Sequence, residues 1–193
     1  FTGAITINGG TLATSSTQGF GSTTATANLN MAGGTTLRYS NAGILSTTRT
    51  LALGSSAVIV DITSATGDLR FPLGGKITGT APAGSMQLTK TGPGTFGSNI
   101  SNNPTSQSTY AGDTEVLSGT IRSSQSTGTN QFFGTGTIFL GDTSGSNNTT
   151  LLLGGTNAIL ANPLVVRAGN SGTSLLCNQN TGTASTYNGT ITL

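Results

Sequence analysis

One short pattern occurs three times in this chain and limits its possible folds more than any other feature. The first copy reads Phe1-x-Gly3-x-Ile5-x-Ile7-x-x-Gly10-Thr11-Leu12. The second has the same spacing from Tyr110 to Ile121, and the third repeats the first seven positions from Tyr187 to Leu193. Apolar residues two apart lie on one side of a β-strand, and glycine permits the turn that follows. Three copies in one chain predict a repeat architecture.

The composition is unusual for a folded protein, since only 33% of the residues are hydrophobic and 6% are charged. Disordered chains also have low hydrophobicity, but they usually carry high charge, which this chain lacks. Its apolar residues are mostly aliphatic or β-branched and occur in i, i+2 pairs, as in Val58, Val60 and Ile62. This period is typical of strands. The sequence therefore predicts an ordered all-β protein with short strands and no significant helix, in which these three residues face the core and Asp61 faces outward.

The lengths of the strands and turns favour a solenoid over a sandwich. A sandwich would show long alternating strands joined by hairpin turns. Here the apolar runs cover three to five residues, and the glycines and asparagines between them are irregularly spaced. We therefore predict a single parallel β-solenoid domain over residues 1–193. At roughly twenty residues per coil it would make about nine or ten coils, a rod about 45 Å long.

The stretch Leu88-Thr-Lys90-Thr-Gly92-Pro-Gly94-Thr, followed by the copy from Tyr110 to Ile121, resembles the autotransporter-associated β-strand repeat of bacterial surface proteins. The resemblance is specific over these thirty-odd residues and looser over nearly the whole chain. It implies a right-handed parallel β-helix that is secreted and held at the cell surface, so an extracellular or cell-surface location is expected. We interpret Lys90 as a turn residue beside Gly92.

Both ends of the chain consist of ordinary repeat units. Neither residues 1–12 nor residues 187–193 contain a charged residue or a proline, which commonly protect an exposed strand edge. The solenoid is therefore expected to be uncapped at both ends, either as a segment of a longer surface protein or as a subunit that stacks head to tail into a homopolymer. The aromatic residues Phe1, Tyr110 and Tyr187 are expected to pack in the core. The residues predicted for the assembly interface are Phe1, Ile5, Ile7, Leu12, Tyr187, Ile191 and Leu193.

Some β-helices cleave polysaccharides, so a catalytic site was considered. Such chemistry needs a pair of carboxylates in a cleft. Of the five acidic residues, only Asp113 and Glu115 are close in sequence, and we interpret them as a solvent-facing pair. The chain has no histidine, and its single cysteine, Cys177, follows two leucines and is expected to be buried. The sequence thus predicts a protein that is not an enzyme, with no catalytic residues, cofactor or metal site.

Charge and hydropathy bear on the possible partners. The seven basic residues are scattered along the chain, whereas nucleic-acid binding uses clustered lysines and arginines. No apolar run approaches the roughly eighteen residues of a membrane span. A structural surface protein with itself as partner is the main hypothesis. The alternative is an adhesin that contacts surface glycans or a host through side loops at residues 98–109 or 123–130.

Overall fold

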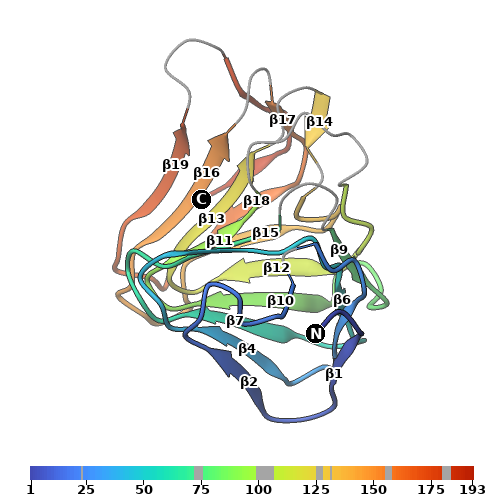
Figure 1. Ribbon diagram of the computed structural model, residues 1–193. Helices are drawn as coiled ribbons and strands as arrows, with labels where there is room; N and C mark the ends of the chain where they lie inside the picture. The colour runs from blue at the N-terminus through green and yellow to red at the C-terminus, as the bar shows by residue number, and fades with distance from the viewer. Residues whose placement is uncertain are drawn as a thin grey trace.

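The computed structural model describes residues 1–22, 24–71, 76–98, 107–124, 128–130, 132–154, 158–179 and 184–193 (Figure 1). None of these residues lies in a helix, so the described chain contains no helix that could cross a membrane. Every strand pairs in parallel with a strand from the coil before or after it. The predicted all-β fold of parallel strands stacked as a solenoid is confirmed.

Four sheets run along the stack. The long sheet contains β2 (Thr11–Thr14), β4 (Thr36–Tyr39), β7 (Val58–Ile62), β10 (Met86–Thr91), β12 (Asp113–Val116), β15 (Ile138–Leu140), β18 (Leu164–Val166) and β21 (Ile191–Thr192). The six-stranded sheet contains β5 (Ile44–Ser46), β8 (Asp68–Arg70), β11 (Thr95–Gly97), β13 (Gly119–Ser124), β16 (Thr149–Gly154) and β19 (Ser174–Asn178). The four-stranded sheet contains β1 (Ile5–Ile7), β3 (Leu29–Met31), β6 (Leu51–Leu53) and β9 (Ile77–Gly79), and the three-stranded sheet contains β14 (Gly128–Asn130), β17 (Ala158–Leu160) and β20 (Thr186–Tyr187).

The coils are longer than the roughly twenty residues that the sequence predicted. Paired residues on neighbouring strands of the long sheet are separated by 23 residues between Leu37 and Val60, and by 30 between Val60 and Lys90. The long sheet has one strand per coil and contains eight strands, fewer than the nine or ten coils expected. Six of these coils also have a strand in the six-stranded sheet. Eight rungs at about 4.8 Å give a rod of roughly 38 Å. The extra residues lie in turns and loops, which lengthen a coil without adding a rung.

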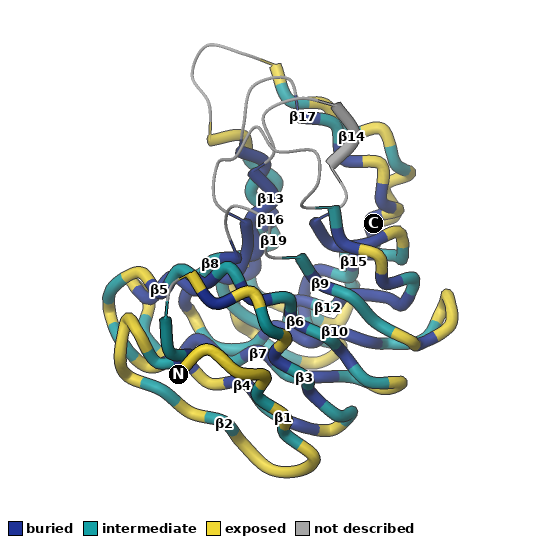
Figure 2. The backbone as a smooth tube through the Cα atoms, turned by 45° about the vertical axis from the view of Figure 1, so that its right-hand side comes forward, coloured by how far each residue is buried: buried dark blue, intermediate teal, exposed yellow. Residues whose placement is uncertain are grey.

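The core fills the interior of the stack. Val58, Val60 and Ile62 are fully buried, as predicted, while Asp61 is partly exposed and pairs with Arg38 on the outer face. Figure 2 shows exposed residues gathered at the turns and on the first rung, with buried residues along the inside. Four aromatic rings stabilise the middle of the stack by edge-on and tilted contacts, with centroid separations from 5.0 to 6.4 Å. These rings belong to Phe71, Phe96, Phe132 and Phe133.

The copies of the repeated motif build different corners of the solenoid. The first copy supplies β1 of the four-stranded sheet and β2 of the long sheet, whereas the second supplies β12 of the long sheet and β13 of the six-stranded sheet. At the corner in these two copies, Gly10 and Gly119 share a φ of 75°, a conformation that side chains disfavour. The motif is thus a strand–turn–strand corner unit. It predicts a repeat fold correctly but does not determine to which sheet each strand belongs.

Because the copies lie at different corners, the three aromatic residues that begin them have different surroundings. Tyr110 is fully buried, as predicted, and its hydroxyl lies 2.6 Å from that of Thr114. Tyr187 is partly buried against the core. Phe1 is 71% exposed, so the expectation that it packs in the core is wrong. It lies at the open side of the first rung of the stack.

Candidate functional site

The predicted acidic pair is occupied by structural contacts. An oxygen of Asp113 accepts a hydrogen bond from the backbone N–H of Thr137 on the next coil, at 2.8 Å. Glu115 accepts a 2.8 Å bond from the Thr89 hydroxyl and forms a 2.8 Å ion pair with Arg167. Asp113 is buried and Glu115 is partly buried, so the pair does not face solvent as expected. Each carboxylate thus stabilises the stacking of coils.

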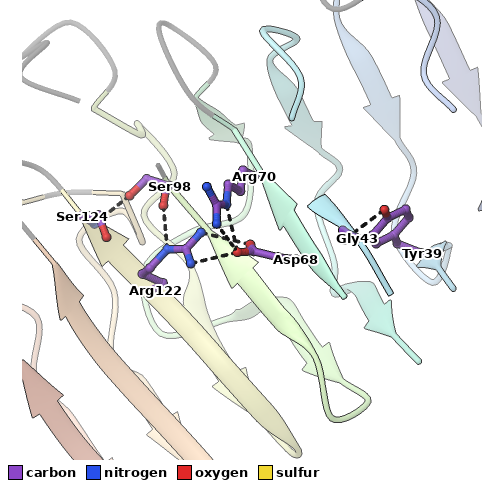
Figure 3. Close-up of polar contacts among 7 residues, drawn as sticks. All are labelled: Tyr39, Gly43, Asp68, Arg70, Ser98, Arg122 and Ser124. Atoms are coloured by element: carbon purple, nitrogen blue, oxygen red, sulfur yellow. Dashed lines mark hydrogen bonds and ion pairs between the residues drawn. The ribbon is translucent and has the colours of Figure 1, made fainter. Parts of the chain in front are cut away.

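A buried ionic cluster lies on the six-stranded sheet (Figure 3). Arg122 binds both oxygens of Asp68, at 2.9 and 3.0 Å, although the two residues are 54 positions apart. Arg70 binds the same carboxylate at 2.7 Å, and the Arg122 Nε donates to the Ser98 carbonyl at 3.0 Å. The side chains of Arg122 and Asp68 are only 8% and 12% exposed. Paired charges and satisfied donors are what allow such groups to be buried.

A glycine makes room for this cluster. Arg70, Gly97 and Arg122 are in register on three neighbouring strands, so the two arginines lie on either side of Gly97. A Cβ on Gly97 would collide with the carbonyl oxygen of Arg122. The sheet can therefore pair closely here only because position 97 has no side chain.

Replacing Gly97 with alanine is expected to lower the free energy of unfolding by about 1–3 kcal/mol, because the collision involves backbone that cannot move without breaking the ladder. Denaturant unfolding followed by circular dichroism measures the loss. Gly9→Ala is the matched control, since a Cβ there would meet nothing within 4 Å. Equal stability of the two variants would contradict the close approach at Gly97.

Lys90, Arg49 and Asn162 are among the other buried side chains that donate hydrogen bonds to backbone carbonyls. The Lys90 ammonium donates to the carbonyls of Thr91 and Gly92, both at 2.7 Å, and of Ser118 on the next coil at 3.2 Å. Because Lys90 is in register with Val60 and Val116, its side chain starts from the inward face of the long sheet. Lys90 is fully buried, and the interpretation of it as an ordinary turn residue is wrong. Its position two residues after Leu88 was the sequence signal for an inward-facing side chain.

Arg49 and Asn162 join coils in the same way. The Arg49 guanidinium donates to the carbonyls of Gly3, Phe20 and Ala27 at 2.7 to 2.9 Å, and it is fully buried. The Asn162 amide donates to the carbonyl of Gly136 at 2.8 Å and also reaches those of Phe133 and Gly134. Nothing in the local sequence indicated these contacts, because each one joins residues more than twenty positions apart.

The residues predicted for assembly lie on the first and last rungs, as their positions in the sequence require. Ile5, Ile7, Leu12 and Tyr187 are partly buried and pack against the two ends of the core. Phe1, Ile191 and Leu193 are 71%, 50% and 92% exposed. The structure thus divides the set into side chains that cover the ends of the core and side chains that project from them.

The remaining sequence expectations concern Cys177 and the side loops. Cys177 is partly exposed, in register with Leu152 on the outer face, so its predicted burial is wrong. Residues 99–106 and 125–127 of the two expected loops lie outside the described residues. The second expected loop, residues 123–130, is in part strand, because it includes the end of β13 and all of β14. Within the described chain, no three His, Cys, Asp or Glu residues are grouped so that they could hold a metal ion. Searches against protein-family models, curated proteins and solved structures find no match.

Proposed function

We propose that this chain is a non-enzymatic structural solenoid of the bacterial cell surface, a rod that further coils extend at its ends. One observation carries the proposal. Among the described residues, five large hydrophobic side chains are substantially exposed: three belong to the first or last strand of a sheet, and the other two lie before β1 and directly after β21. They are Phe1, Ile44, Leu175, Ile191 and Leu193.

The exposed hydrophobics coincide with open strand edges. β1, β2 and β5 end their sheets on one side of the stack, and β19, β20 and β21 end theirs on the other. An open edge presents unpaired N–H and C=O groups that can template another strand. A further coil would pair with these groups and bury apolar area, which stabilises by roughly 25 cal/mol per Å². Such a coil comes either from further repeats of the same polypeptide or from a second copy of the chain.

The outer surface has few unpaired charges, which is typical of a structural rod. The charged side chains of the outer sheet faces pair with one another, as in Arg38 with Asp61 and Arg167 with Glu115. The remaining surface is rich in threonine, serine and asparagine and has few charged sites for proteases to recognise. The resemblance of residues 88–121 to the autotransporter repeat supports an extracellular location. Stability that is nearly additive along the stack suits a stalk or fibre.

Electron microscopy of the 193-residue chain at neutral pH and micromolar concentration tests the proposal. Head-to-tail stacking of copies predicts uniform fibres with an axial repeat of about 38 Å, the height of eight rungs. Dispersed short rods would reject the homopolymer and leave extension by further repeats of the same polypeptide. Globular particles without a long axis would reject the rod itself.

Ile191→Asp is expected to abolish fibres, because it places a charge on the last strand of the long sheet where another rung would bury it. Sedimentation velocity measures the loss as a shift from polymer to monomer. The control is Ser55→Asp, which adds the same charge to an exposed turn in the middle of the stack. Fibres that survive Ile191→Asp would show that this edge does not assemble.

A further inference from the structure

A hollow of about 310 Å³ lies on the outside of the corner between the long sheet and the six-stranded sheet. It forms because turn lengths change abruptly from coil to coil. The two turns that lead into β11 and β13 cover residues 92–94 and 117–118, whereas the loop that leads into β16 covers residues 141–148. The longer loop projects past the two short turns and forms one wall of the hollow. Pro93 and Ser118 lie on the short turns, and Asn147 and Asn148 on the loop.

The wall is held in place on both sides by the neighbouring coils. The carbonyl of Asn148 accepts the N–H of Gly119 at 2.9 Å, and its side-chain oxygen accepts the N–H of Thr173 at 2.9 Å. The Asn170 amide donates to the Asn147 carbonyl at 3.0 Å. The hollow is therefore formed before any ligand binds, and a preformed site loses little entropy on binding.

The polar groups that line the hollow have unused hydrogen-bonding capacity. Within the described chain, the hydroxyls of Ser118, Thr120 and Thr150 and the side-chain amide of Asn147 form no hydrogen bond. Thr120 and Thr150 are in register on β13 and β16, so the same hydroxyl recurs at the spacing of the rungs, about 4.8 Å. The exposed ring of Pro93 adds an apolar contact.

A second hollow, of about 290 Å³, differs from the first in its lining. It lies over the four-stranded sheet and is lined largely by apolar or small residues such as Met31, Ala52 and Leu53. Its Asn30 amide already donates to the Thr6 hydroxyl at 3.2 Å. Within the described chain, the side chains of Asn8 and Thr80 in this second hollow also form no hydrogen bond. The first hollow is distinguished by the in-register pair of unbonded hydroxyls, Thr120 and Thr150.

We propose that the hollow lined by Ser118, Thr120, Asn147 and Thr150 binds an uncharged saccharide unit. Hydroxyls and carboxamides both donate and accept hydrogen bonds, which matches the hydroxyls of a neutral sugar. Among the described residues, no charged side chain lines the hollow, so an ionic ligand would have no opposite charge to pair with there. The Lys90 ammonium bonds to the Ser118 carbonyl, but it is buried and also bonds to two other carbonyls. The apolar face of a sugar ring can pack on Pro93 while its hydroxyls reach the threonines.

This site is independent of rod extension, because its residues belong to coils in the middle of the stack. Binding and fibre formation can therefore be measured separately on the same protein. Failure of one leaves the other intact.

Saturation-transfer difference NMR of the full chain tests the proposal with three neutral probes, cellotriose, chitotriose and maltotriose, and one anionic probe, trigalacturonate. Saturation transfer to at least one neutral probe at millimolar concentration is expected. Thr120→Val with Thr150→Val removes two hydroxyls at nearly constant shape, and it should weaken binding at least about tenfold. Thr11→Val, on the exposed face of β2, is the matched control and should bind as the unaltered chain does.

Three results would overturn the proposal: no transfer to any neutral probe, transfer to the anionic probe alone, or full binding by the double valine variant. Asn147→Ala is the second test, because its side chain projects from a loop and forms no hydrogen bond within the described chain. Its fold is therefore expected to be intact by circular dichroism, and unchanged affinity in this variant would also count against the site.

Discussion

Asp68→Ala is expected to lower the free energy of unfolding by roughly 3–5 kcal/mol, the cost of breaking a buried ion pair by removing one partner. The Asp68 carboxylate accepts hydrogen bonds from the two terminal nitrogens of Arg122, and it contacts two nitrogens of Arg70. The Arg122 side chain is only 8% exposed, and without this carboxylate its guanidinium would keep, among the described residues, only the bond to the Ser98 carbonyl. Because the pair joins β8 to β13 across β11, its loss weakens three rungs together.

The matched control is Asp61→Ala. The Asp61 side chain is 14% exposed, close to the 12% of Asp68, but its partner Arg38 is 48% exposed, whereas Arg122 is 8% exposed. Pairs with a partner open to solvent contribute about 0–1 kcal/mol. Urea unfolding of both variants under the same conditions gives the comparison. Adding Arg122→Met to Asp68→Ala removes the stranded charge and should restore part of the loss. Similar losses in the two single variants would show that the buried cluster does not stabilise the stack.

The second large effect concerns the pH dependence of stability through Lys90. Burial lowers the pKa of the Lys90 ammonium from 10.5 to about 7, although the attraction of Asp61 partly opposes this shift. Between pH 7 and pH 10.5 the unfolded chain therefore binds a proton that the folded chain has released. The free energy of unfolding rises with pH across this window, by at most about 1.4 kcal/mol per pH unit. The total gain reaches several kcal/mol.

Other groups act in the opposite direction at the upper end of this window. Burial raises the pKa values of Tyr39, Tyr110, Tyr187 and Cys177. These groups keep their protons in the folded state after the unfolded chain has lost them, so their contributions fall above about pH 9 to 10. Stability should therefore reach a maximum in mildly alkaline solution.

The difference in the free energy of unfolding between the unaltered chain and a Lys90 variant, measured at each pH, isolates the contribution of Lys90. Lys90→Met removes the titrating amine and keeps most of the side-chain volume, so its stability should not rise between pH 7 and pH 9. Lys76→Met, a change of the same type at a partly exposed lysine, is the control and should keep the rise. Thermal unfolding at intervals of half a pH unit gives both curves. Parallel curves for the unaltered chain and Lys90→Met would rule out Lys90 as the source.

Several features of the fold could be predicted because they depend on near neighbours in the sequence. The i, i+2 pattern of Val58, Val60 and Ile62 predicted a strand with one inward face, and the structure confirms it. The repeated strand–glycine–strand motif predicted corners, and Gly10 and Gly119 have the required positive φ. Short strands without hairpin signals predicted parallel stacking, which all pairings show.

The functional details were harder to predict, because each depends on contacts between coils. Asp68 and Arg122 are 54 residues apart, the length of two coils, so no local pattern links them. The sequence predicted that the acidic pair faces solvent, but Arg167 and Thr137 contact it from later coils. The hollow beside Thr120 exists because two short turns are followed by a longer loop.

By itself the sequence determined the strands, their inward faces and the corner turns, since these follow from backbone preferences and the two-residue period of a strand. Only the tertiary structure decided which sheet each strand joins, as the two copies of the motif at different corners show. It also decided that Lys90 reaches the turn of the next coil and that Phe1 is exposed. The physical reason is register. The length of each loop determines which residues of successive coils are paired, and a local pattern contains no information about residues 23 to 30 positions away.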